Sequence, residues 1–298
     1  MLDYTLETAT QFQPLLDCAA NQKPGRCVVF DGLDAAVRRL YQSFERTYPR
    51  KIIISPAKKM NIDTDSFAPE ALPQFLPEAE QLKAALQGMP AQELQVLWKC
   101  NDALTVLNVE RLRTMDLHSR LTPAILSYQG IQYRYMAPSV FEDGHFAYVR
   151  EHLRILSGFY GLLRPFDGVT PYRLEMQAKL SVNGCKDLYD FWGSKLAGQL
   201  VAETDFVLNL ASKEYSRAVE PHLPPSTRFL TCTFGERKDG RIIEKGTMCK
   251  MARGQMVRWL AEHQVTVPED IQNFDQLGYC FAKDDSTDSH YVFIKGEV

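Results

Sequence analysis

The chain lacks the features that mark membrane-spanning, secreted and zinc-binding proteins. No apolar run in its 298 residues approaches the ~20 residues that a membrane span requires. The first residues include early acids and neither the basic nor the apolar region of a secretory signal. The seven cysteines form no Cys-x-x-Cys pair, and no two histidines have zinc-site spacing. We therefore expect a cytoplasmic protein without membrane contact, metal site or cofactor, whose thiols are reduced and mostly buried. A redox-sensing cysteine stays an alternative.

The chain also lacks the basic excess that is usual in nucleic-acid-binding proteins. Lys and Arg number 34 against 37 Asp and Glu, which gives a formal net charge of -3. The charges are unevenly placed, however. Residues 237–258 hold seven basic and two acidic side chains, a local sum of +5, whereas residues 259–298 hold two basic and eight acidic ones, a local sum of -6. The net charge therefore does not exclude a DNA-binding face.

The chain is about twice as long as a typical domain of ~150 residues. Its apolar patterns favour a mixed α/β (α+β) fold without a regular βαβ repeat. Strands are expected at residues 51–54, 171–176 and 205–210, in a hairpin of 227–236 with 241–245 across Lys238-Asp239-Gly240, and at 279–283 and 290–295. Helices are expected at 90–115, 145–157, 186–202, 212–219 and 247–263. A further strand and helix are expected within 27–47.

Ser55-Pro56-Ala57-Lys58 directly follows the strand expected at 51–54. Ser at an N-cap and Pro at the first helical position predict a helix that begins here. Free backbone N–H groups and the Lys58 ammonium would then form an anion site. The alternative is a capped helix start without a ligand. The glycines of a nucleotide-binding P-loop are missing, which excludes that class of site.

Residues 209–215 repeat this arrangement, since Asn209 ends an apolar strand and Ser212 precedes a short helix. Together with Arg173-Leu174-Glu175, the two strand ends predict one polar pocket. Its candidate residues are Ser55, Glu175, Asn209, Ser212 and Glu214. Glu175 or Glu214 would be a general base if the ligand were a substrate. The alternative is that Asn and Ser act only as turn residues.

Two glycines in the stretch 153–165 give the outline of a helix-hairpin-helix. Gly158 and Gly161 would bring backbone N–H groups close to a phosphate, and Phe159 would pin the turn to the core. The match is imperfect, because two residues rather than one separate the glycines and Pro165 follows closely. A corner between two helices with a glycine C-cap is the alternative.

Lys250 and Arg253 lie three residues apart in the basic helix expected at 247–263. This spacing places both on one helix face, where they would bind one acceptor or simply face solvent. The sequence contains no Gly-x-Ser-x-Gly, His-Glu-x-x-His or Rossmann motif, so no catalytic residue is assigned.

Six motifs in order resemble the YaaA family of peroxide stress resistance proteins, over about residues 51–298. They are Ile-Ile-Ile-Ser-Pro-Ala-Lys at 52–58, Leu-Ser-Gly-Phe-Tyr-Gly-Leu-Leu-Arg-Pro-Phe-Asp at 156–167, Pro-Tyr-Arg-Leu-Glu-Met at 171–176, Lys-Asp-Leu-Tyr-Asp-Phe-Trp at 186–192, Asn-Leu-Ala-Ser-Lys-Glu-Tyr at 209–215 and Lys-Met-Ala-Arg-Gly at 250–254.

The resemblance implies a compact α/β fold with a helix-hairpin-helix and a positively charged cleft that binds DNA. It also implies a cytosolic role in surviving hydroperoxide stress, associated with limiting free iron. The hairpin maps to Leu156–Leu163, with Gly158, Phe159 and Gly161. The bases assigned to the cleft are Lys58, Arg164, Arg173, Lys250 and Arg253.

Two functions follow as expectations. The first is a non-enzymatic, monomeric protein that binds double-stranded DNA without sequence preference. The alternative is an enzyme or binding protein for a nucleotide-like anion in the polar pocket. Residues 51–298 are expected to form one domain. The stretch 1–50 is expected to be an N-terminal extension: an edge element, the remnant of a fused module, or a mis-set start.

Overall fold

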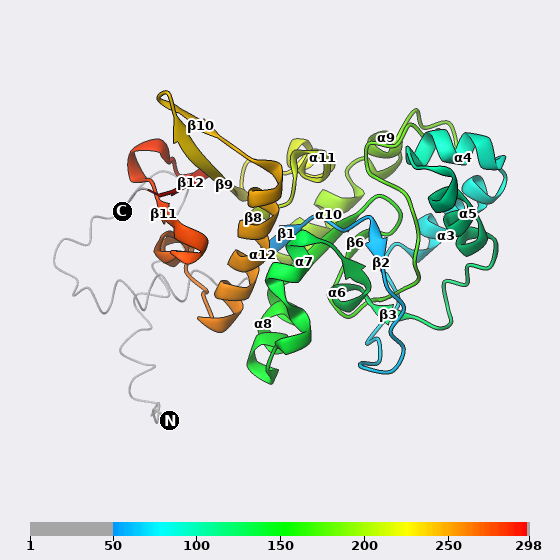
Figure 1. The fold of residues 1–298 in the computed structure, drawn as a ribbon, viewed down its shortest axis with the longest axis horizontal. Helices are drawn as coiled ribbons and strands as arrows, with labels where there is room; N and C mark the ends of the chain where they lie inside the picture. Colours follow the sequence, from blue (N-terminus) through cyan, green and yellow to red (C-terminus); the bar gives the residue numbers. More distant parts are fainter. Residues whose placement is uncertain (1–49, 297–298) are drawn as a thin grey trace, which may run out of the picture. The chain divides into compact units, whose positions relative to one another are not determined.

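The computed structural model describes residues 50–296 (Figure 1). The strand and helix predicted within 27–47, and nearly all of the predicted extension, lie outside the described residues. The predicted mixed α/β fold is confirmed, because a mixed sheet is packed between helices. No helix among residues 50–296 is long and apolar enough to span a membrane.

The main sheet has eight strands in the order β11-β12-β9-β8-β1-β5-β6, and β10 pairs with β9 at the side. Five neighbouring strands, from β12 to β5, run parallel, whereas β6, β10 and β11 pair antiparallel. The bounds are β1 Lys51–Ile54, β5 Leu153–Ser157, β6 Gly161–Leu163, β8 Phe206–Leu210, β9 Arg228–Lys238, β10 Arg241–Ile243, β11 Tyr279–Phe281 and β12 His290–Lys295. The four residues of β1 are all buried, as expected for a parallel strand covered on both faces.

Ten α-helices among the described residues surround the sheet. They are α3 Leu76–Gln87, α4 Ala91–Trp98, α5 Asp102–Arg113, α6 Ala124–Ser127, α7 Ile131–Met136, α8 Asp143–His152, α9 Leu188–Trp192, α10 Lys195–Glu203, α11 Lys213–Ser216 and α12 Gly246–Glu262. Two small ladders pair β2 Lys59–Met60 with β4 Tyr128–Gln129, and β3 Thr122–Pro123 with β7 Gly168–Val169. Short 3-10 turns lie at Pro138–Val140, Glu220–His222, Pro268–Asn273, Gln276–Gly278 and Lys283–Asp285.

Helices α12 and α7 lie side by side and pack very closely (Figure 1). Their closest approach is at Gly254, where a Cβ atom would collide with the backbone carbonyl oxygen of Gln132. Only a residue without a side chain allows this crossing. The crossing fixes the basic residues of α12 relative to the segment that contains Gln132.

Several predicted elements are confirmed: β1, β8, the β9–β10 hairpin, the two last strands and the basic helix α12. The helix predicted over 90–115 is instead two helices. Lys99 ends α4 in the left-handed conformation with φ 47°, and the Asn101 side chain accepts the Leu104 N–H to begin α5. The helix predicted over 186–202 is likewise interrupted, at Gly193 with φ 46°. The stretch 171–176 is an irregular loop rather than a strand.

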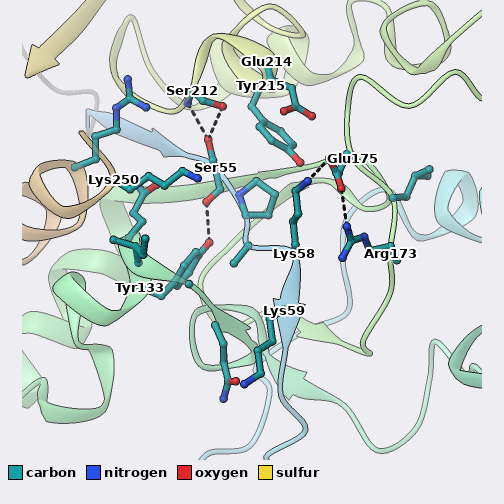
Figure 2. Close-up of a pocket in the computed structure, with 18 of the residues that line it drawn as sticks. Ser55, Lys58, Lys59, Tyr133, Arg173, Glu175, Ser212, Glu214, Tyr215 and Lys250 are labelled. Atoms are coloured by element: carbon teal, nitrogen blue, oxygen red, sulfur yellow. Dashed lines mark hydrogen bonds and ion pairs between the residues drawn. The ribbon is translucent and has the colours of Figure 1, made fainter. Parts of the chain in front are cut away.

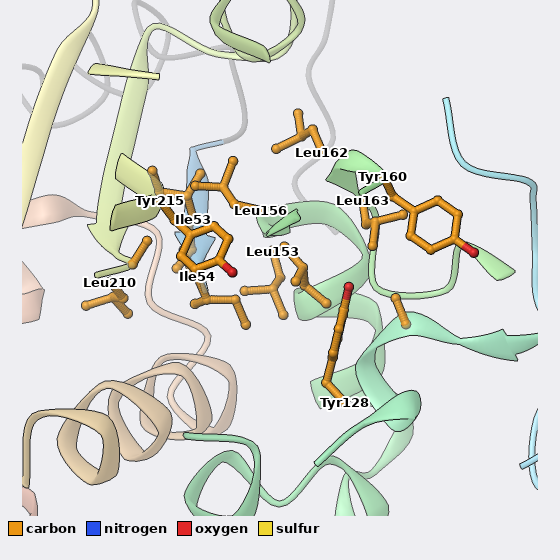
Figure 3. Packing of buried hydrophobic residues seen from close by; sticks show 14 of the residues in the cluster. Ile53, Ile54, Tyr128, Leu153, Leu156, Tyr160, Leu162, Leu163, Leu210 and Tyr215 are labelled. Atoms are coloured by element: carbon orange, nitrogen blue, oxygen red, sulfur yellow. The ribbon is translucent and has the colours of Figure 1, made fainter. Parts of the chain in front are cut away.

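The predicted helix-hairpin-helix is wrong. Helix α8 ends at His152, and β5 and β6 form an antiparallel β-hairpin that is buried throughout. The Ser157 hydroxyl accepts the N–H groups of Phe159 and Tyr160 at 3.1 and 2.9 Å, which closes the turn. Gly161 provides the φ of +74° at which β6 begins. Leucines of both strands pack into the core (Figure 3).

This β-hairpin removes the phosphate contact that was predicted for Gly158, Phe159 and Gly161. All three residues are buried. A Cβ on Gly158 would lie 2.7 Å from the Leu174 carbonyl oxygen, so its backbone is covered by the 171–176 loop. The prediction failed because apolar residues at 149, 153 and 156 fit two structures equally well: one continuous helix, or a helix followed by a fully buried strand.

The helix predicted to begin at Ser55 is also absent. Residues 55–57 have no regular secondary structure, and Lys59 and Met60 pair with Gln129 and Tyr128 as β2 with β4. The backbone N–H groups expected at a helix N-terminus are therefore not presented here. The polar side chains of this segment nevertheless face a cavity.

Candidate functional site

A cavity of about 380 Å³ lies where β1 and β8 end (Figure 2). Neighbouring parallel strands end at the same sheet edge, which is where α/β proteins commonly bind ligands. Four segments and one helix form its walls: residues 55–59, 129–133 and 172–175, then Ser212, Glu214 and Tyr215, and finally Lys250 and Arg253 of α12.

Hydrogen bonds between side chains and backbone join three of these walls. The Ser212 N–H donates to the Ser55 hydroxyl at 2.8 Å, and the two serine hydroxyls are 3.2 Å apart. The Tyr133 hydroxyl donates to the Ser55 carbonyl oxygen at 3.0 Å. The ends of β1 and β8 and helix α7 are thereby held together, so the cavity is a built feature of the fold.

A second network supports the wall that contains Tyr172. Its hydroxyl lies 2.8 Å from the Tyr128 hydroxyl and 2.6 Å from the Ser157 hydroxyl, and all three groups are buried. Burial raises the pKa of Tyr172 to about 12. These hydroxyls stay neutral at physiological pH, so the network positions the wall without adding charge.

The two carboxylates of the cavity have different surroundings. Glu175 lies 2.8 Å from the Lys58 ammonium and 3.2 Å from the Arg173 guanidinium. Glu214 has no ion-pair partner among residues 50–296 and accepts the Gln177 N–H at 3.3 Å. Burial raises the pKa of Glu214 above its ordinary value, and the negative charge of Glu175 raises it further. Glu175 is thus neutralised by cations, whereas Glu214 is not.

Positive charge predominates in the lining. Five cationic side chains stand against the two carboxylates, a formal excess of three positive charges. Lys58, Lys59 and Lys250 are exposed, whereas the side chains of Arg173 and Arg253 are only 10% and 14% exposed. Lys59 and Lys250 form no ion pair with any described residue, and Arg253 lies 3.8 Å from Glu244. The cavity is therefore suited to an anion.

Three buried nitrogens of the lining lack a hydrogen-bond partner: Gln132 Nε2, Arg173 Nε and Arg253 Nε. Only one other buried side-chain nitrogen or oxygen of residues 50–296, Trp98 Nε1, has none. An unsatisfied buried donor costs about 1–3 kcal/mol, so native folds rarely retain one without a reason. All three are donors. All three belong to residues that line this one cavity.

Eight of the predicted site residues line this one cavity: Ser55, Lys58, Arg173, Glu175, Ser212, Glu214, Lys250 and Arg253. Asn209 lies outside the lining. Its side chain accepts the Ala211 N–H at 3.0 Å and donates to the Thr231 hydroxyl at 3.2 Å, so it shapes the turn after β8. Arg164 is exposed and also lies outside the lining.

The lining also contains residues that the sequence did not indicate: the wall at 129–133, Lys59, Tyr172 and Tyr215. Tyr172 and Tyr215 lie within two of the six motifs that resemble the YaaA family, and this position is a signal for both residues. The sequence gives no comparable signal for Gln132, because its place at the cavity depends on the crossing of α7 and α12 at Gly254.

The buried thiols are poorly suited to sense peroxide. Burial raises the pKa of Cys249 to about 11 and raises that of Cys232 further, which disfavours the reactive thiolate at neutral pH. Among the described residues, no group of three or more His, Cys, Asp or Glu side chains is placed to hold a metal ion.

Comparisons with known proteins match this chain to one family. The family model described as peroxide stress protein YaaA matches residues 51–285. A UPF0246 protein of Desulfitobacterium hafniense is 52% identical over 245 residues, which cover 82% of this chain and 98% of the relative. UPF0246 proteins of Agathobacter rectalis and Pediococcus pentosaceus are 50% and 49% identical, over 82% and 83% of this chain and 98% and 99% of their own lengths. The chain therefore belongs to the peroxide stress protein YaaA family, as its motifs predicted.

Proposed function

We propose that the cavity binds a small, nucleotide-like anion that carries a phosphate group. The observation that carries this proposal is the set of three unpartnered buried donors, on Gln132, Arg173 and Arg253, in a lining with excess positive charge. Phosphate oxygens satisfy such donors and are neutralised by the neighbouring cations. Because residues 153–163 form a β-hairpin and not a helix-hairpin-helix, the cavity is better supported as a binding site than the predicted hairpin.

The size and walls of the cavity support the same ligand class. A volume of about 380 Å³ falls within the ~300–1,000 Å³ typical of small-molecule sites. Arg253 and Lys250 project from one helix face and suit the phosphate, while Tyr133, Tyr172 and Tyr215 add aromatic surface for a sugar or base. The guanidinium groups of Arg173 and Arg253 are mostly buried, so they are already positioned before a ligand arrives.

Calorimetric titration with adenosine monophosphate, adenosine and inorganic phosphate tests this function. We expect the monophosphate to bind at least about tenfold more tightly than adenosine, because only it offers charged acceptors to the orphan donors. Arg253→Ala should weaken its binding about tenfold or more. Arg258→Ala is the matched control, because Arg258 lies on the same helix outside the cavity and pairs with Glu262. Equal affinity for adenosine and its monophosphate, or an unaffected Arg253→Ala variant, would contradict the proposal.

Double-stranded DNA is the second candidate, favoured by the exposed Lys59 and Lys250, which pair with no described acid. Sequence-independent contact with the DNA backbone would use these ammonium groups at the rim of the cavity. Binding of a fluorescent duplex should then weaken with salt at a log–log slope of about -0.9 per phosphate neutralised. Lys250→Glu should reduce it strongly and Arg164→Glu should not, because Arg164 lies outside the cavity. Absent or salt-insensitive binding would exclude this candidate.

The family description provides the cellular setting: we infer that the site acts during peroxide stress. Protection against hydroperoxide and iron-driven damage would then depend on ligand binding. A strain that lacks its own family member should regain hydroperoxide tolerance with the wild-type chain and with Arg258→Ala, but not with Arg253→Ala. Full rescue by Arg253→Ala would separate the stress role from the cavity.

A further inference from the structure

The two cavity carboxylates differ in a way that binding alone does not require. Glu175 forms ion pairs with Lys58 and Arg173. Glu214 lines the same cavity but forms no ion pair with any residue among 50–296, and Figure 2 accordingly draws no ion pair to its carboxylate. Paired carboxylates whose surroundings differ in this way are the arrangement that enzymes use to separate a proton-transferring group from a charge-stabilising one.

The position of Glu214 is fixed by contacts on each side of it. The preceding Ser212 is tied to Ser55 by its N–H, and the Tyr189 hydroxyl donates to the Glu214 carbonyl oxygen at 2.9 Å. The following residue, Tyr215, is buried. A short helix, α11, thus presents the carboxylate from a rigid base, as positioned general bases require.

We propose that the cavity hydrolyses a phosphate ester of its ligand and that Glu214 is the general base. This inference rests on the proposed binding of a phosphate-bearing anion. Arg173, Arg253 and Lys250 would neutralise the phosphoryl oxygens, and Glu214 would orient the attacking water. Glu175 keeps the Lys58 and Arg173 side chains in place.

The step balances without any co-reactant except water. The water oxygen forms a bond to phosphorus while the bond from phosphorus to the ester oxygen breaks. Glu214 takes a proton from the water and returns one to the departing oxygen, so the products are an alcohol and inorganic phosphate. The enzyme ends in the protonation state in which it started, and no electron is transferred.

The protonation behaviour of Glu214 agrees with this role. Burial raises its pKa above the ordinary value, the charge of Glu175 raises it further, and the charge of Lys58 opposes this. The other titratable groups beside it are Tyr189 and Tyr215, whose own pKa values are raised by burial and which therefore stay neutral. Glu214 is thus the carboxylate of this cluster whose pKa is raised.

Release of phosphate from adenosine monophosphate and of nitrophenolate from p-nitrophenyl phosphate tests the proposal. We expect turnover by the wild type and a loss of about 10²–10⁴-fold in Glu214→Gln, with the affinity for adenosine monophosphate retained. The wild-type rate should also rise with pH along an acid limb that the variant lacks. Glu220→Gln is the control, since Glu220 is exposed and lies outside the cavity.

The outcomes separate this inference from the binding proposal. Tight binding of the monophosphate with no turnover of either ester overturns the hydrolysis and leaves the binding site standing. Turnover that survives in Glu214→Gln overturns the assignment of the base. If Glu214→Gln keeps the wild-type unfolding temperature but no longer binds the monophosphate, Glu214 is a binding group. That result also overturns its assignment as the base. Absence of binding in the wild type defeats the proposed function itself.

Discussion

Replacement of Gly254 by alanine tests how the crossing of α7 and α12 builds the cavity. The added Cβ would collide with the backbone carbonyl oxygen of Gln132, and no rotamer change relieves a clash between a Cβ and backbone. Gly→Ala inside a helix contributes about 1 kcal/mol of stability from propensity alone. Overpacking of a buried contact costs about 1–3 kcal/mol, and here whole helices must separate, which places the cost at the upper end. The net expectation is a destabilisation of about 1–2 kcal/mol.

Gly198→Ala provides the matched control for this substitution. Gly198 lies inside α10, and a Cβ there would meet nothing within 4 Å. The same change should therefore stabilise the protein by up to about 1 kcal/mol. Urea unfolding followed by circular dichroism measures both variants. If Gly254→Ala proved as stable as Gly198→Ala, the close crossing would not exist as described.

The Gly254→Ala variant should also lose affinity for adenosine monophosphate. The substitution moves Lys250 and Arg253 on α12 away from Gln132 on α7, and the donors then no longer converge on one ligand. A folded variant with unchanged affinity would refute the claim that this crossing aligns the site. Gly198→Ala should bind like the wild type.

Three further predictions concern single side chains. Glu175→Gln should tighten binding of the monophosphate several-fold, because it frees the charges of Lys58 and Arg173 for the ligand; calorimetry showing weaker binding would contradict this. Burial raises the pKa of Asp167 from 3.8 to about 6, so the native state binds this proton more tightly than the unfolded chain does. The free energy of unfolding should therefore fall by up to about 3 kcal/mol as the pH rises from about 4 to about 7. Urea unfolding between pH 4 and pH 7 should show a smaller fall in Asp167→Asn, and equal slopes would disprove the assignment. Tyr172→Phe should lower the free energy of unfolding in urea by about 1–3 kcal/mol, because it removes the hydrogen bonds of the Tyr172 hydroxyl to Tyr128 and Ser157. An unchanged free energy of unfolding would show that this network does not support the wall.

The sequence predicted those parts of the fold whose signals are local. The turn at Asp239-Gly240 and the basic helix α12 follow from residues close together in the chain. The meeting of Ser55 with Ser212 was also predictable, because both follow apolar strands that are suited to a parallel sheet. Eight site residues could be named on these grounds.

The remaining parts depend on contacts between distant segments. Leu153, Ile155 and Leu156 fit a continuation of α8 as well as a buried strand. Only the pairing of this stretch with β1, in which Ile52 lies opposite Leu153, decides between the two. Gln132 carries no motif, and its place in the cavity depends on Gly254 more than a hundred residues later. Asn209 has the right residue type and position, but its side chain bonds to Ala211 and Thr231 and does not line the cavity.

The central claim is that the orphan donors of the cavity receive the oxygens of a phosphate-bearing ligand. The most direct measurement follows the side-chain nitrogen resonances of Arg173 Nε, Arg253 Nε and Gln132 Nε2 by NMR during titration with adenosine monophosphate. We predict that all three shift and that their protons become protected from exchange with water, whereas adenosine leaves them unchanged. Binding of the monophosphate without a change in these three resonances would contradict the account.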